Sequence, residues 1–166
     1  MDGVFSNKGD ELRFGRPRDN AAFVYRVSAL IIRNEKLLAV GNISLPGLYY
    51  TIGGAVNIHE TSEEAVIREV EEEIGIRLEV ERLAFVNEEF FILNGKKIHQ
   101  MAFCYLMKAE PSLDIAEGSF TDQGEKETLH WLSLDKLNDY NLVPGFLKSR
   151  KLDNITAVEH IISKEY

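Results

Sequence analysis

Residues 53–76, GGAVNIHETSEEAVIREVEEEIGI, contain the clearest helix signal in the chain. The helix is predicted to begin after Thr61, because Thr61-Ser62-Glu63-Glu64 is a capping box in which the Thr61 and Glu64 side chains satisfy each other's backbone N–H groups. Gly75 stands where a left-handed residue commonly ends a helix. Between these ends, four apolar residues recur at helical spacing and predict one buried stripe: Val66, Ile67, Val70 and Ile74.

The same helix carries a group of carboxylates beside its apolar stripe. At about 100° per residue, Glu69, Glu72 and Glu73 fall within an arc of roughly 100°, which we expect to face the loop of residues 53–60. Like charges three and four residues apart destabilise a helix by about 0.2–0.5 kcal/mol per pair. Arg68 is the only basic residue on the helix that could reduce this repulsion. A solvated helix face usually carries more basic residues. Unpaired carboxylates instead favour a hard divalent cation such as Mg²⁺, which takes oxygen ligands and is completed by substrate phosphates.

These residues resemble the Nudix family. Gly54, Glu60 and the run from Arg68 to Ile76 match every fixed position of the 23-residue Nudix box, Gly54–Ile76. The flanks are similar too, with strands before the box, a hairpin after it and an acidic loop leading to Trp131. The resemblance implies a fold of the α/β (α+β) class, an α/β/α sandwich with a mixed β-sheet, formed by one Nudix hydrolase domain over residues 1–166.

The resemblance also implies an activity, which is hydrolysis of a pyrophosphate bond in a nucleoside diphosphate linked to another moiety, with Mg²⁺ or Mn²⁺. Nucleoside triphosphates, ADP-ribose and nucleotide sugars are the substrates to consider. By the family's motif, the metal ligands would be Glu69, Glu72 and Glu73. Glu60 would support the metal site and Arg68 would orient a glutamate. Gly53 and Gly54 would let the backbone bend closely around metal and phosphates.

In the implied mechanism, a metal-activated water attacks one phosphorus while the cations neutralise charge on the transferred group. An acidic residue before the Trp strand often acts as base or extra ligand in the family. Glu125 is the first candidate here, with Glu127 or a box glutamate as alternatives. Relatives often carry a proline where Ile52 stands, and a glutamate and a glycine where Asn57 and His59 stand, so the substrate is left open.

Composition limits the other functions. The chain has 166 residues, of which 45% are hydrophobic and 28% charged, as expected for one folded domain. Its net charge of −8 disfavours sequence-independent binding to DNA and counts against decapping of RNA. There is no apolar run long enough for a membrane span, and the single Cys104 excludes an intramolecular disulfide, so a cytoplasmic setting is expected. A non-catalytic nucleotide sensor is the alternative function, and a homodimer remains open.

The rest of the chain predicts strands around the helix. Residues 1–20 indicate an extended or irregular lead-in, and residues 23–32 with 36–40 indicate a hairpin. Asn94-Gly95 predicts a second hairpin, because both residues tolerate the positive φ of a type I′ turn. Short helices are expected after Ser133 and Pro144.

Three further side chains stand out on the predicted strands. Arg26 lies alone among apolar residues, and alternation leaves open whether it faces the substrate. His99 follows a Glu-Phe-Phe pattern seen among some Nudix proteins and is a candidate for the substrate pocket. Cys104 lies in an apolar strand and is interpreted as a buried small hydrophobe.

Overall fold

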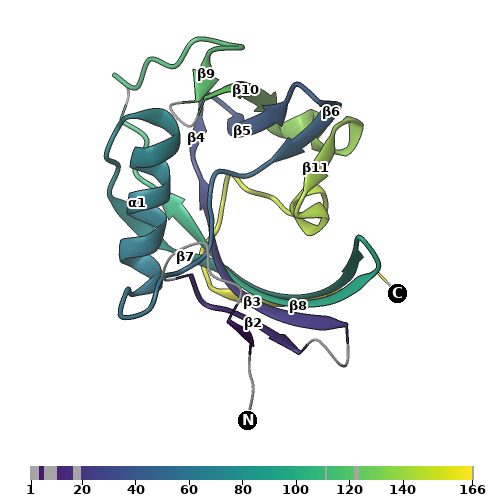
Figure 1. Cartoon of the computed structure of the whole chain (residues 1–166). Helices are drawn as coiled ribbons and strands as arrows, with labels where there is room; N and C mark the ends of the chain where they lie inside the picture. The colour runs from purple at the N-terminus through teal and green to yellow at the C-terminus, as the bar shows by residue number, and fades with distance from the viewer. Residues whose placement is uncertain (1–3, 6–10, 17–19, 111, 122–123, 166) are drawn as a thin grey trace.

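The computed structural model describes residues 4–5, 11–16, 20–110, 112–121 and 124–165. These residues form two mixed six-stranded sheets and one α-helix, α1, at Ser62–Ile74. In Figure 1, α1 stands on one side of the two sheets, and two 3₁₀ helices lie on the other. The 3₁₀ helices are η2 (Leu134–Asp139) and η3 (Gly145–Ser149), where short helices were predicted. The fold is therefore of the mixed α+β class, as predicted.

The first sheet has the order β1-β2-β3-β8-β7-β12. Its strands are β1 (Val4–Phe5), β2 (Arg13–Arg16), β3 (Ala21–Leu30), β8 (Lys96–Met107), β7 (Val80–Leu93) and β12 (Glu159–Lys164). The β3–β8 and β7–β12 pairs are parallel and the others are antiparallel, which makes the sheet mixed. The Asn94-Gly95 hairpin between β7 and β8 is confirmed, with φ of 50° and 76° at these two residues.

The second sheet has the order β11-β6-β5-β10-β9, with β4 also paired to β5. Its strands are β11 (Asn141–Val143), β6 (Leu45–Tyr50), β5 (Lys36–Asn42), β10 (Gly124–Ser133), β9 (Phe120–Thr121) and β4 (Ile32–Arg33). The β11–β6 pair is parallel, so this sheet is mixed as well.

Two strand predictions need correction. The predicted hairpin of residues 23–32 with 36–40 is wrong in its first half, because β3 pairs with β2 and β8 in the first sheet. Only the two residues of β4 pair with β5, around a tight turn with positive φ at Asn34 and Glu35. The lead-in, predicted to be extended or irregular, is more regular than expected, because it contains β1 and β2, which form the edge of the first sheet. Alternation identifies a strand, but its partner depends on contacts far away in the sequence.

Helix α1 begins and ends as predicted. Thr61 has extended φ and ψ of −73° and 154°, and the capping box is complete, with the Thr61 backbone N–H donating to Glu64 Oε2 over 2.9 Å. Gly75 adopts φ of 69° and donates its N–H to the Glu71 carbonyl, which ends the helix. Val66 and Val70 are fully buried against both sheets. This packing holds the acidic side of the helix next to the preceding loop.

A second core fills the side of the sheets opposite α1. Phe85 and Cys104 from the first sheet pack there with Leu37 of the second sheet and Leu147 of η3. Burial raises the pKa of the Cys104 thiol to about 12, so the residue remains a neutral, buried small side chain. Among the described residues, no helix has the length and apolar character needed to cross a lipid bilayer.

Candidate active site

The loop that precedes α1 is fixed against β3 by its backbone. Val27 donates its N–H to the Gly54 carbonyl over 2.9 Å, and Ala29 donates to the Ile52 carbonyl over 2.8 Å. Gly53 has φ of 150°, and a Cβ there would overlap the Val27 carbonyl oxygen. A Cβ on Gly54 would overlap the Glu69 carboxylate. Gly53 therefore allows β3 to approach the loop, and Gly54 allows the Glu69 carboxylate to approach it. These contacts explain why glycine stands at both positions, whereas the sequence predicted only that the backbone bends there.

Arg68 is the centre of an ion-pair network that links this loop to the helix. Its Nε and Nη2 donate to the two Glu60 carboxylate oxygens over 2.7 and 3.0 Å, and Nη1 donates to Glu69 Oε1 over 2.6 Å. Nη2 also donates to the Ala55 carbonyl over 3.1 Å, and Glu72 lies 3.4 Å from Nη1. Arg68 thus orients Glu60 and Glu69, and the carboxylates are less isolated than the sequence suggested.

The Arg68 contacts affect the charge of Glu60. The hydrogen bonds from Arg68 lower the pKa of Glu60, and the Asn57 backbone N–H, which donates to Glu60 Oε2 over 2.9 Å, adds to this effect. Glu60 therefore stays ionised and holds the guanidinium in place. The hydrogen bond to Glu60 also has the largest effect on the pKa of Arg68, which it raises.

Glu73 and Glu69 are partly buried carboxylates whose pKa values shift in the opposite direction to that of Glu60. The pKa of Glu73 is raised to about 8, chiefly by burial and also by the nearby Glu69 and Glu127 charges, whereas the Gly53 N–H opposes the shift. That N–H donates to Glu73 Oε1 over 3.2 Å. Burial also raises the pKa of Glu69, against the effect of Arg68. Partial burial therefore disfavours the ionised form of both carboxyl groups in the protein without a bound cation.

A hollow of about 300 Å³ lies beside these carboxylates. It is lined by Arg26, Val40, Asn42, Tyr50, Thr51, Gly53, Glu73 and Glu127. Glu127, the second candidate for the base, lies on β10 and borders this hollow. Glu125 also belongs to β10, but its side chain is outside the described residues. Asn42, Tyr50 and Thr51 were missed, because only the pairing of β5 with β6 brings them to the loop.

The donor set of the site fits a hard divalent cation. Its acidic side chains offer oxygen ligands, and a cation would favour the ionised forms of Glu69 and Glu73, whose pKa values are raised chiefly by burial. Within the described part of the chain, no three His, Cys, Asp or Glu side chains converge in metal-binding geometry. Arg68 contacts Glu69 and Glu72, and Gly53 binds one Glu73 oxygen. A bound cation would therefore require these side chains to turn away from their present partners.

His99 does not line the hollow. Its Nε2 lies 3.0 Å from Glu88 Oε1, and its ring stacks on Phe90 with centroids 4.3 Å apart. His99 is not among the residues that line this hollow, since Phe90 and Glu88 on the neighbouring strand contact its ring, and a role in the substrate pocket stays a prediction.

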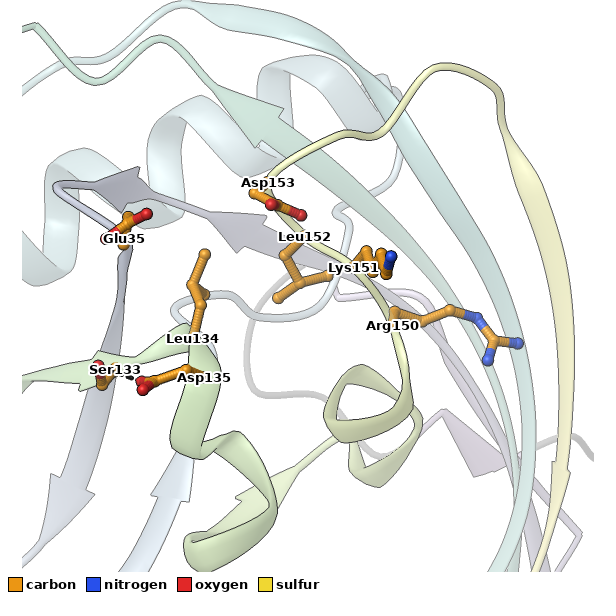
Figure 2. A pocket seen from close by; sticks show the side chains of 8 residues that line it. All are labelled: Glu35, Ser133, Leu134, Asp135, Arg150, Lys151, Leu152 and Asp153. Atoms are coloured by element: carbon orange, nitrogen blue, oxygen red, sulfur yellow. Dashed lines mark hydrogen bonds between the residues drawn. The ribbon is translucent and has the colours of Figure 1, made fainter.

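A second hollow, of about 350 Å³, is shown in Figure 2. It is lined by Glu35, Ser133, Leu134, Asp135, Arg150, Lys151, Leu152 and Asp153. Arg150 turns away from the acidic side chains and donates to Glu159 over 3.1 Å. None of the predicted catalytic, glycine or metal residues lines this hollow, so the smaller one beside α1 is the candidate active site.

Comparison with known proteins identifies the family. A profile of the NUDIX domain matches residues 22–151. The chain belongs to the Nudix family. The NAD-capped RNA hydrolase NudC of Pseudomonas aeruginosa is 30% identical over 105 residues, which cover 63% of this chain and 34% of NudC. The match thus spans about a third of that relative's length.

Solved structures give the same result for the fold. The MutT protein of Bacillus halodurans superposes with a TM-score of 0.63 at 17% identity, covering 86% of this chain and 91% of that one. A UDP-X diphosphatase superposes with a TM-score of 0.50 at 26% identity, covering 72% of this chain and 54% of that one. The α+β architecture is therefore that of Nudix proteins.

Proposed function

We propose that this Nudix protein hydrolyses a pyrophosphate bond in a nucleoside diphosphate linked to another moiety, using Mg²⁺ or Mn²⁺. The observation that carries the proposal is the partial burial of Glu69 and Glu73 against the glycine loop, where Glu73 borders a hollow large enough for part of a nucleotide. Buried carboxylates at this density are costly without a counterion, and a divalent cation with a bound phosphate would supply one.

The roles of the residues follow from their contacts. Glu69, Glu72 and Glu73 would hold the metal, which supplies charge neutralisation and an activated water when bound. The Glu60–Arg68 pair holds Glu69 in place, and the Gly53 N–H orients Glu73. Glu127 borders the hollow and is the better-supported acceptor for the proton of the attacking water, with Glu125 as the alternative.

The substrate class is supported by two of the similar proteins. NudC is named for NAD-capped RNA and the diphosphatase for UDP-X, and both names denote a nucleoside diphosphate joined to a further group. The net charge of −8 favours a small nucleotide over an RNA chain, because phosphate backbones are bound by basic surfaces. A small nucleotide as partner and a cytoplasmic setting are parts of this proposal.

A substrate panel tests the proposal directly. Nucleotide sugars, ADP-ribose, dinucleoside polyphosphates and nucleoside triphosphates are incubated with Mg²⁺ or with chelator, and released phosphate, pyrophosphate and mononucleotide are measured. At least one member should be hydrolysed in a metal-dependent way. Glu73→Gln should reduce that turnover by orders of magnitude. The control Glu71→Gln removes a charge from the outer side of α1, where Glu71 pairs with Arg77 over 3.0 Å, and should leave turnover unchanged.

The panel also has outcomes that oppose the proposal. Turnover that is indifferent to chelator would contradict the metal-dependent mechanism. Binding of panel members without any hydrolysis by the folded protein would support the nucleotide sensor instead.

A further inference from the structure

Arg26 extends from β3 toward the candidate active site and uses little of its hydrogen-bonding capacity. Its Nη2 donates to the Gly53 carbonyl over 3.1 Å, which is its only hydrogen bond to another described residue. A guanidinium carries five N–H donors in a fixed fork. Arg26 also lines the 300 Å³ hollow, where it is the one basic side chain among the described residues. Arg26 thus has N–H donors without a partner among the described residues, and it borders a space that a ligand can enter.

The charge of Arg26 is not matched by a direct ion pair within the described chain. Burial lowers the pKa of Arg26, and the nearby Arg13 guanidinium lowers it further. The charges of Glu69 and Glu73 raise the pKa of Arg26. Neither carboxylate forms a direct ion pair with Arg26, because Glu69 is hydrogen-bonded to Arg68 and Glu73 to the Gly53 N–H. A partly buried guanidinium at the edge of a hollow is a good site for an anion, since charge-assisted contacts to phosphate are strong and often bidentate.

Gly53 places this guanidinium next to the proposed metal ligands. Its carbonyl accepts from Arg26, and its N–H donates to Glu73. The cationic side chain and the carboxylate thus contact the two ends of one residue's backbone. A pyrophosphate bridge has two adjacent phosphoryl groups, so one can reach a metal held by Glu73 while the other reaches Arg26.

We propose that Arg26 binds the phosphoryl group next to the one that the metal contacts, and so selects ligands with two linked phosphates over monophosphates. The inference rests on the proposed function, which places the metal at Glu73. The proposal also explains how a protein with a net negative charge binds an anion. The metal would neutralise the charge of the carboxylates, and Arg26 would neutralise the charge of the second phosphate.

A structural role for Arg26 is the competing explanation. Burial raises the pKa of Glu89 on β7, and the Arg26 charge partly opposes that shift. Glu89 also accepts from Gln100 Nε2 over 3.0 Å. If Arg26 served only to balance this buried carboxylate, its loss would lower stability without changing phosphate affinity.

The test compares Arg26→Gln and Arg26→Lys with Arg77→Gln, which removes an equal charge from an exposed ion pair with Glu71. Binding of inorganic pyrophosphate and of orthophosphate is measured by calorimetry with Mg²⁺ present, and KM and kcat are measured on the best substrate of the panel. Arg26→Gln should weaken pyrophosphate binding and raise KM about 10- to 100-fold, with a smaller effect on orthophosphate. Arg26→Lys should fall in between, and Arg77→Gln should match the unmodified protein.

Other results would overturn the inference. Pyrophosphate affinity equal in Arg26→Gln and Arg77→Gln, with a lower unfolding temperature for Arg26→Gln alone, would assign Arg26 to the structural role. No pyrophosphate binding by the unmodified protein would also reject the inference. Failure of the proposed function is a separate result, because a protein that hydrolyses no panel member can still show the Arg26-dependent difference in pyrophosphate binding.

Discussion

Replacing Glu73 by Gln in the metal-free protein should change how stability depends on pH. Burial raises the pKa of Glu73 from its ordinary value of 4.5 to about 8. The folded protein therefore binds this proton more tightly than the unfolded chain does. The resulting stability is fully present below about pH 4.5 and is lost as the pH rises toward 8.

The size of this effect follows from the same two pKa values. A tenfold change in proton affinity corresponds to about 1.4 kcal/mol, so ionising Glu73 costs the folded protein about 4 kcal/mol by pH 8. Gln cannot ionise, has nearly the same shape, and keeps an oxygen for the Gly53 N–H. In chelator, Glu73→Gln should match the unmodified protein near pH 5 and exceed its free energy of unfolding by up to this amount at pH 8.

Urea unfolding followed by circular dichroism between pH 5 and pH 9 measures this difference. Glu71→Gln is the control, because it removes a half-exposed carboxylate from the same helix and should give a curve parallel to the unmodified protein. Adding Mg²⁺ should then stabilise the unmodified protein at pH 8 but not Glu73→Gln, since a ligand bound only to the folded state adds to its stability. Parallel curves for Glu73→Gln and the unmodified protein over the whole pH range would refute the reasoning.

Three further substitutions test other parts of the site. Gly54→Ala should displace the Glu69 carboxylate and lower Mn²⁺ affinity by at least about tenfold, measured by calorimetry; unchanged affinity would mean that the loop shifts freely. Thr61→Ala should cost about 1 kcal/mol of unfolding free energy by loss of the helix cap, with KM unchanged. Arg68→Lys removes the two parallel hydrogen bonds to Glu60 and the contact with Glu69, so it should weaken Mn²⁺ binding without changing the secondary structure. Unchanged Mn²⁺ affinity would show that a positive charge at this position is sufficient.

Local signals predicted the helix and one hairpin well. The limits of α1 depend on Thr61, Glu64 and Gly75, whose effects act within one turn of the chain, and all three act as predicted. Asn94-Gly95 likewise forms its turn because few other residues adopt positive φ at low cost. The partner of β3 was mispredicted, because the nearest strand in sequence is not its neighbour in the sheet.

Periodicity alone predicted that Glu69, Glu72 and Glu73 lie beside the buried stripe of the helix, because an α-helix repeats every 3.6 residues whatever surrounds it. In the structure Glu69 and Glu73 meet the glycine loop, whereas Glu72 is exposed beside Arg68. Tertiary structure decided the rest. Arg68 reaches across to Glu60, and Arg26 from β3 meets Gly53, only where the loop and β3 pack together. Burial, and with it the raised pKa of Glu73, depends on the whole surrounding chain, so these properties arise only when distant segments exclude water together.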